Sequence, residues 1–170
     1  MSGAAYYGKY RGTVIDNVDP LRLGRVQAMV PSIGGQELTT WALPCVPLAG
    51  PSMGTYFVPQ VGAGVWIEFE AGDVDFPVWT GCYWTTAAEV PAPPEAGESA
   101  TPGIVIQTGM QHSIVLSDAP GPTGGIMLRS ATGATILVND AGITITNGKG
   151  ATIELTGPSV SVNGADLTAR

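Results

Sequence analysis

The sequence predicts an all-β protein in two parts, a small N-terminal barrel and a C-terminal stack of short strands. Glycine and proline account for 24 and 14 of its 170 residues, which favours tight turns. Valine, isoleucine and threonine are plentiful, which favours strands. Apolar residues alternate with polar ones over short stretches, and this period of two is typical of strands with one buried face.

The N-terminal part is expected to form a barrel. Turns rich in Asp, Asn, Gly and Pro separate six expected strands, at 9–16, 25–31, 40–43, 55–58, 64–70 and 78–83. In the fifth strand, Val65, Ile67 and Phe69 form an apolar face. Five or six short strands within about 80 residues, without a helix of note, favour a small closed barrel.

Residues 87–103 are expected to be a linker between the two parts. They contain four prolines and three glutamates and no bulky aromatic residue. Such a composition gives a stiff, solvated spacer. It separates a domain at 1–86 from a second one at 104–170.

The C-terminal part repeats a simple unit, two apolar residues with one residue between them. The last five pairs show a near-repeat of about 17 residues, which is typical of stacked β-structure. Each unit offers too few apolar residues for a core of its own, so three chains around one axis are expected to bury them as a prism. The pairs are Ile104/Ile106, Ile114/Leu116, Ile126/Leu128, Ile136/Val138, Ile143/Ile145, Ile153/Leu155 and Val160/Val162, of which the last five are the predicted trimer core.

Charge and hydropathy limit the possible partners. The formal net charge is −7, only 12% of residues are charged, and mean hydropathy is +0.22, which predicts burial in an oligomer or a membrane. The uncharged stretch 38–67 contains four prolines and therefore cannot be a spanning helix. The N-terminus lacks the layout of a signal peptide, so we expect a soluble protein made in the cytoplasm. No basic cluster is present, which argues against nucleic acid.

Several residues of the first part carry a family resemblance. Asp19 and Pro20 are followed by Leu-Gly-Arg-Val at 23–26, Gly-Thr-Tyr-Phe-Val-Pro at 54–59, and Gly72 and Asp73 leading to Pro-Val at 77–78. This order resembles the OB-fold domain of baseplate assembly protein V. That domain is shared by phage spikes, VgrG spikes of type VI secretion systems and extracellular contractile injection systems. An OB domain followed by a β-repeat is also similar to that family.

The resemblance implies the central spike of a contractile, phage-tail-like injection system. The spike would be a homotrimer that caps the tube and pierces the target envelope, with an OB-fold collar at 1–86 and an intertwined, triple-stranded β-helix needle at 104–170. It would be assembled in the cytoplasm and reach the extracellular space or the target membrane with the particle. The lysozyme domain of some phage spikes and the hub domain of VgrG have no counterpart here, so a separate hub or tube-initiator protein and other baseplate proteins are expected partners.

Two surfaces are expected to meet such partners. Aromatic residues are common at protein interfaces, so Tyr6, Tyr7 and Tyr10 are the expected contact with the hub or tube. A blunt end with exposed strand edges favours a binding partner at the needle tip. The resemblance suggests a small PAAR-type tip protein, bound at Val160, Val162, Asn163 and Asp166.

Catalytic and metal chemistry find little support. His112 is the single histidine; three copies could meet on a threefold axis and hold a metal, but a plain turn histidine is favoured. No serine-nucleophile elbow is present. Glu68 and Glu70 lie on the solvent face of an expected strand, and Asp73 and Asp75 in a turn, so neither pair spans a cleft as in a glycosidase. We therefore expect no enzyme, no metal and no cofactor.

An alternative function is an OB-fold module that binds an oligonucleotide or a glycan. Trp66, Trp79, Tyr83 and Trp84 could stack on such a ligand, but acidic residues surround them, which favours packing against protein instead. Cys45 and Cys82 lack metal-ligand spacing, and buried, reduced thiols are favoured over a disulfide.

Overall fold

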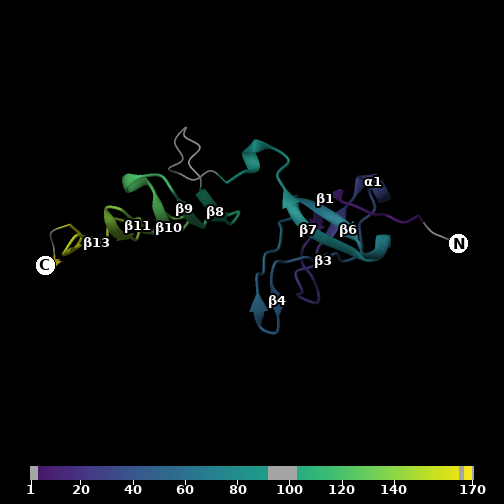
Figure 1. The fold of residues 1–170 in the computed structure, drawn as a ribbon, viewed down its shortest axis with the longest axis horizontal. Coiled ribbons are helices and arrows are strands. Elements are labelled where there is room, and N and C mark those ends of the chain that lie inside the picture. The colour runs from purple at the N-terminus through teal and green to yellow at the C-terminus, as the bar shows by residue number, and fades with distance from the viewer. Residues whose placement is uncertain (1–3, 92–102, 165–166, 170) are drawn as a thin grey trace. The chain divides into compact units, whose positions relative to one another are not determined.

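The computed structural model describes residues 4–91, 103–164 and 167–169. The chain divides into two compact units, Met1–Val90 and Pro91–Arg170 (Figure 1). Both are built mainly from strands, so the predicted all-β fold is confirmed. The division falls inside the predicted linker, most of which, at 92–102, lies outside the described residues.

The first unit is a five-stranded sheet in the order β2-β1-β6-β7-β3. Its strands are β1 (Tyr10–Asp16), β2 (Gln27–Met29), β3 (Leu43–Pro44), β6 (Gly64–Phe69) and β7 (Pro77–Tyr83). β3 pairs with β7 in parallel, and the other pairs are antiparallel. Isolated bridges join Val26 to Ala42 and Met29 to Leu38. The segment that leads into β3 therefore contacts both edges of the sheet, which curls into a barrel as predicted.

Two of the expected strands differ from the structure. The expected strand at 40–43 begins later, as β3, and 55–58 forms no strand; a short hairpin of β4 (Ala49–Gly50) and β5 (Met53–Gly54) precedes it. The hairpin extends away from the five-stranded sheet (Figure 1). Prolines before, within and after this segment remove the N–H donors that a longer ladder needs.

The helical segments are short. They are α1 (Pro31–Gly34) and the 3-10 turns η1 (Glu70–Gly72), η2 (Ala87–Glu89) and η3 (Gly121–Thr123). η2 occupies the beginning of the predicted linker. Among the described residues, no helix has the length and apolar character needed to cross a membrane.

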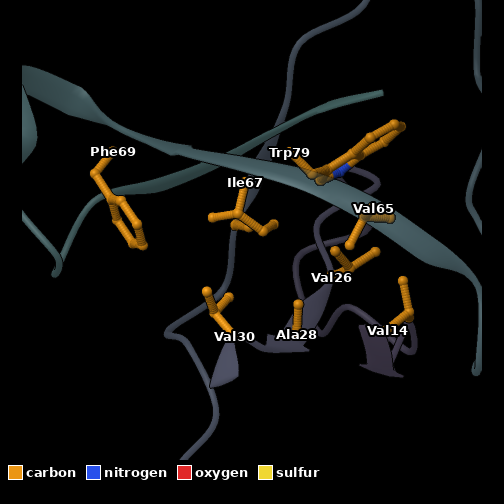
Figure 2. Packing of buried hydrophobic residues seen from close by; sticks show 9 residues of the cluster. Val14, Val26, Ala28, Val30, Val65, Ile67, Phe69 and Trp79 are labelled. Atoms are coloured by element: carbon orange, nitrogen blue, oxygen red, sulfur yellow. The ribbon is translucent and has the colours of Figure 1, made fainter. Parts of the chain in front are cut away.

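The core of the first unit lies between β6, β7 and the β1–β2 edge. Side chains of β6 face those of β1 and β2 across it (Figure 2). Val65, Ile67 and Phe69 are all buried, so the alternation predicted for this strand is confirmed. The buried cluster consists of Val14, Val26, Ala28, Val30, Ala42, Val65, Ile67, Phe69 and Trp79.

The second unit is one antiparallel meander of eight strands, β8 to β15 in sequence order. Each predicted apolar pair falls on one of the first seven strands. These are β8 (Gly103–Gln107), β9 (Ser113–Ser117), β10 (Gly125–Arg129), β11 (Thr135–Asn139), β12 (Gly142–Thr146), β13 (Thr152–Thr156) and β14 (Ser159–Val162). The eighth strand, β15 (Leu167–Ala169), was not predicted from the apolar pairs. Consecutive strands pair within one chain, so the intertwining of three chains stays a prediction.

Two glycines fix the start of equivalent strands in the meander. Gly125 and Gly142 are the first residues of β10 and β12, 17 positions apart, and both have positive φ. A Cβ on Gly125 would lie 2.1 Å from the carbonyl oxygen of Val138, and one on Gly142 would lie 2.0 Å from that of Leu155. Only glycine fits so close to the neighbouring strand at these two positions.

Candidate interaction surface

The apolar pairs of the meander form two continuous rows on one face of the sheet. In an antiparallel sheet, directly paired residues lie on the same face. The pairing links one residue of each pair to one of the next pair along all seven strands. We call these sets the apolar rows: Ile104, Leu116, Ile126, Val138, Ile143, Leu155 and Val160 in the first, and Ile106, Ile114, Leu128, Ile136, Ile145, Ile153 and Val162 in the second.

Most side chains of the apolar rows are exposed in the single chain. Eleven of the fourteen have exposed fractions between 37% for Val160 and 59% for Ile104. Burying one large aliphatic side chain fully is worth about 1.5–3 kcal/mol. The rows contain no charged residue, and a contiguous exposed face of this kind marks an interaction site.

The opposite face of the sheet changes character along the chain. Its central positions are apolar in the first four strands, where Val115 and Met127 are buried. In the next three strands the same positions carry Thr144, Glu154 and Ser161. The apolar rows are thus the face that stays apolar from β8 to β14.

A groove runs along the second row and has a volume of about 550 Å³. Ile106, Ile114, Leu128, Ile136 and Ile145 line it. The groove gives the face a recessed apolar strip that a protein surface of matching shape can fill.

His112 lies at the edge of this groove, in the turn before β9. Its Nδ1 accepts a hydrogen bond of 3.3 Å from the backbone N–H of Ala131, which ties two turns together. Within the described residues, no three His, Cys, Asp or Glu side chains gather into a possible metal site. The geometry gives His112 a structural role in its turn.

The predicted tip residues that the structure describes lie in β14 and directly after it, near the C-terminal end of the second unit. Asn163 directly follows β14 and holds this end of the strand to the start of β13, because its Oδ1 accepts a hydrogen bond of 3.0 Å from the Thr152 N–H. A free strand edge was predicted at Val160 and Val162. This prediction is wrong, because β15 pairs with β14 along these residues. Asp166 lies outside the described residues.

The three predicted hub-contact tyrosines have different surroundings. Tyr6 and Tyr10 pack on the core of the barrel, with ring centroids 6.2 and 5.6 Å from that of Phe69. Tyr7 is 72% exposed. An outward surface for a partner is thus available at Tyr7, while the other two rings stabilise the first unit.

The four aromatic residues considered for ligand stacking do not form one platform. Trp79 is buried and donates a hydrogen bond of 3.1 Å from Nε1 to the Gly24 carbonyl oxygen. Trp66 and Tyr83 lie 4.9 Å apart, and the Arg11 guanidinium covers both rings. Trp84 is exposed.

The acidic residues and the cysteines show no catalytic arrangement. Glu68 pairs with Lys9, and the Asp73 carboxylate accepts a hydrogen bond from the Asp75 N–H within its turn. Cys45 and Cys82 are free, as favoured from the sequence, but the prediction that they are buried is wrong. Cys45 directly follows β3 and Cys82 is the next-to-last residue of β7, so both lie near strand ends instead of in the core.

Asp19 organises the loop between β1 and β2, a structural role that was not predicted from the sequence. The Asp19 carboxylate accepts hydrogen bonds from the backbone N–H groups of Leu21 and Leu23, at 2.9 and 2.8 Å. Leu21 and Leu23 nevertheless remain more than half exposed. An aspartate before a proline, followed by two leucines at 21 and 23, was the signal in the sequence for a turn that carries apolar side chains.

Comparison with known families assigns each unit separately. Residues 10–84 match a model described as the type VI secretion system/phage-baseplate injector OB domain. Residues 103–168 match a model described as the phage baseplate V C-terminal trimerisation domain. No curated protein matches the chain. The two matched ranges coincide with the barrel and the meander, so the apolar rows lie within the segment that is similar to a trimerisation domain.

Proposed function

The chain belongs to the phage baseplate V, spike-like proteins, with an OB domain followed by a C-terminal trimerisation domain, and on that premise we propose that it is the homotrimeric central spike of a contractile injection system. In this role it caps the tube and pierces the target envelope. The observation that carries the proposal is the pair of apolar rows, which run the length of a domain of the trimerisation family.

Three copies explain the apolar rows better than one. A single sheet has two faces, and here one of them is apolar along seven strands with no second layer among the described residues. Three such sheets arranged around a threefold axis bury all three faces at once. The rows that would meet at that axis contain no charged residue, although each chain carries a formal net charge of −7.

The mechanism of such a spike is stiffness. Consecutive hydrogen-bonded strands form a continuous ladder through the second unit, and burial of the rows joins three ladders into one body. A rigid body of small cross-section transmits the force of sheath contraction to a small area of membrane. This role needs no catalytic group, and we propose that the protein is not an enzyme and needs no cofactor.

The proposed spike has three kinds of contact besides its own copies. A hub or tube-initiator protein and other baseplate proteins contact the first unit, where Tyr7 is the exposed aromatic residue. A PAAR-type protein binds beyond β14. The target envelope is met on firing. We propose assembly in the cytoplasm, followed by release or ejection with the particle.

The test is a mass measurement on the full chain by light scattering. The wild type is expected at three times 17.4 kDa. Ile153→Asp places three carboxylates among the rows and is expected to give monomers, because burying unpaired charges costs several kcal/mol. Thr152→Asp adds the same charge to the other face of the same strand and should leave the trimer intact. A stable Ile153→Asp trimer would disprove the buried axis.

A further inference from the structure

The first unit carries its own groove, apart from the apolar rows, and the residues that line it are uncharged. We call it the hairpin groove; it has a volume of about 460 Å³ and is lined by the β1–β2 loop and by residues 44–57 around the β4–β5 hairpin. Its exposed apolar side chains are Leu23, Leu48, Met53, Tyr56 and Phe57, each at least half exposed. They form a patch of the kind that marks a protein interface.

The hairpin groove is held in shape by local contacts. The Thr55 N–H donates a hydrogen bond of 3.1 Å to the Leu48 carbonyl oxygen. The Tyr56 ring lies 3.2 Å from the position that a Cβ on Gly24 would occupy. Leu23 is fixed through its N–H by the Asp19 carboxylate. A preformed surface loses little conformational entropy when a partner covers it.

The charge distribution identifies which partner fits the hairpin groove. Its lining contains no charged residue, and neither does the whole stretch 38–67. Residues 1–90 carry eight Asp or Glu and four Lys or Arg, all of them outside 38–67, so the charged surfaces of two first units repel each other. The uncharged groove is a place where identical copies can make contact without opposing carboxylates.

We infer that the hairpin groove is covered by the first unit of a neighbouring copy in the same trimer. The inference rests on the proposed function, because the second units hold three first units at high local concentration. Under that condition a modest apolar contact suffices. Around a threefold axis the contact is heterologous, so the groove of each copy meets a different surface of the next copy and three contacts close the ring.

The experiment measures access to the groove by thiol labelling. Ser52, which lines the groove, is changed to cysteine in the full chain, with Cys45→Ser and Cys82→Ser to remove the native thiols. A maleimide dye is the probe. If a neighbouring copy covers the groove, labelling is slow, and adding Phe57→Asp accelerates it about tenfold or more because the contact opens. Phe76→Asp is the matched control, since Phe76 is 57% exposed and Phe57 60%, and Phe76 does not line the groove.

Mass measured on the same samples separates this inference from the proposed function. A trimer with slow labelling that only Phe57→Asp accelerates supports the inference. A trimer in which Ser52→Cys reacts equally fast with and without Phe57→Asp overturns the inference and leaves the spike standing. Equal acceleration by Phe76→Asp, or no acceleration by Phe57→Asp, also overturns it. A monomeric wild type overturns the proposed function and the inference together.

Discussion

Arg25 holds the Asp19 carboxylate through two side-chain hydrogen bonds, from Nε at 3.0 Å and from the terminal guanidinium nitrogen at 2.6 Å, both to Oδ1. The side chain of Asp19 is only 3% exposed. The Arg25 guanidinium keeps the pKa of Asp19 well below its usual range, against the opposing effect of burial, and backbone N–H groups lower it further. One carboxylate thus organises the loop that presents Leu23 to the hairpin groove.

Asp19→Asn is expected to lower the thermal midpoint of the first unit by several degrees at pH 7, because it removes the charge that Arg25 and three backbone N–H groups stabilise. The folded-state pKa of Asp19 is lowered, so its contribution is present above its ordinary pKa and is lost as the pH falls below about 4. The difference in thermal midpoint between the wild type and the variant should therefore shrink as the pH falls from about 5 toward about 3. Thermal melts at each pH measure this difference. Asp75→Asn, in an exposed turn, is the control for the charge change; a difference that does not depend on pH would contradict the assignment.

Trp79→Phe tests the link between the core and this loop. The substitution keeps an aromatic ring but removes the Nε1–H that donates a hydrogen bond to the Gly24 carbonyl oxygen. This buried oxygen is then left without that donor. The expected loss is about 1–2 kcal/mol in the free energy of unfolding, measured by urea denaturation of the first unit's transition. Trp84→Phe, at an exposed site, should cost less than about 0.5 kcal/mol. Equal effects of the two substitutions would show that the hydrogen bond contributes nothing.

The sequence was most informative where a side-chain pattern repeats. Each of the seven apolar pairs marks one strand, because two residues separated by one must share a face of a strand. The alternation of Val65, Ile67 and Phe69 likewise identified β6 and its buried face. In these places local pattern and tertiary packing agree, so the sequence alone was sufficient.

Other features depend on contacts between residues distant in sequence. A short hairpin forms at 49–54, and no strand forms at 55–58, where one was expected, since prolines interrupt the ladder there. Whether Trp79 lies inside or outside the barrel was undetermined until its partner Gly24 was known, 55 positions away. The hairpin groove brings Leu23 next to residues near 50, and no spacing rule in the sequence connects them.

Gly142→Ala is expected to destabilise the second unit. An alanine there meets both a positive φ and the Leu155 carbonyl oxygen 2.0 Å away, at a combined cost of about 2–4 kcal/mol. Gly150→Ala is the matched control, since Gly150 also has a positive φ but nothing lies within 4 Å of its added Cβ. Thermal unfolding of the full chain should show a clearly larger drop for Gly142→Ala. Equal drops would mean that the close approach of β12 to β13 relaxes without cost.

Binding of single-stranded DNA is the measurement that separates a spike from an oligonucleotide-binding OB module. Stacking proteins combine open aromatic faces with a basic groove, whereas here Trp79 is buried and Arg11 covers Trp66 and Tyr83. With a formal net charge of −7, repulsion of phosphates is strongest at low salt. We therefore expect no change in the fluorescence anisotropy of a labelled oligonucleotide in about 20 mM salt, where even weak electrostatic binding would be seen. Arg11→Ala uncovers the two rings without adding positive charge and should also fail to bind, because the acidic surface remains. Saturable binding by the wild type that weakens with added salt would favour the OB binding module instead.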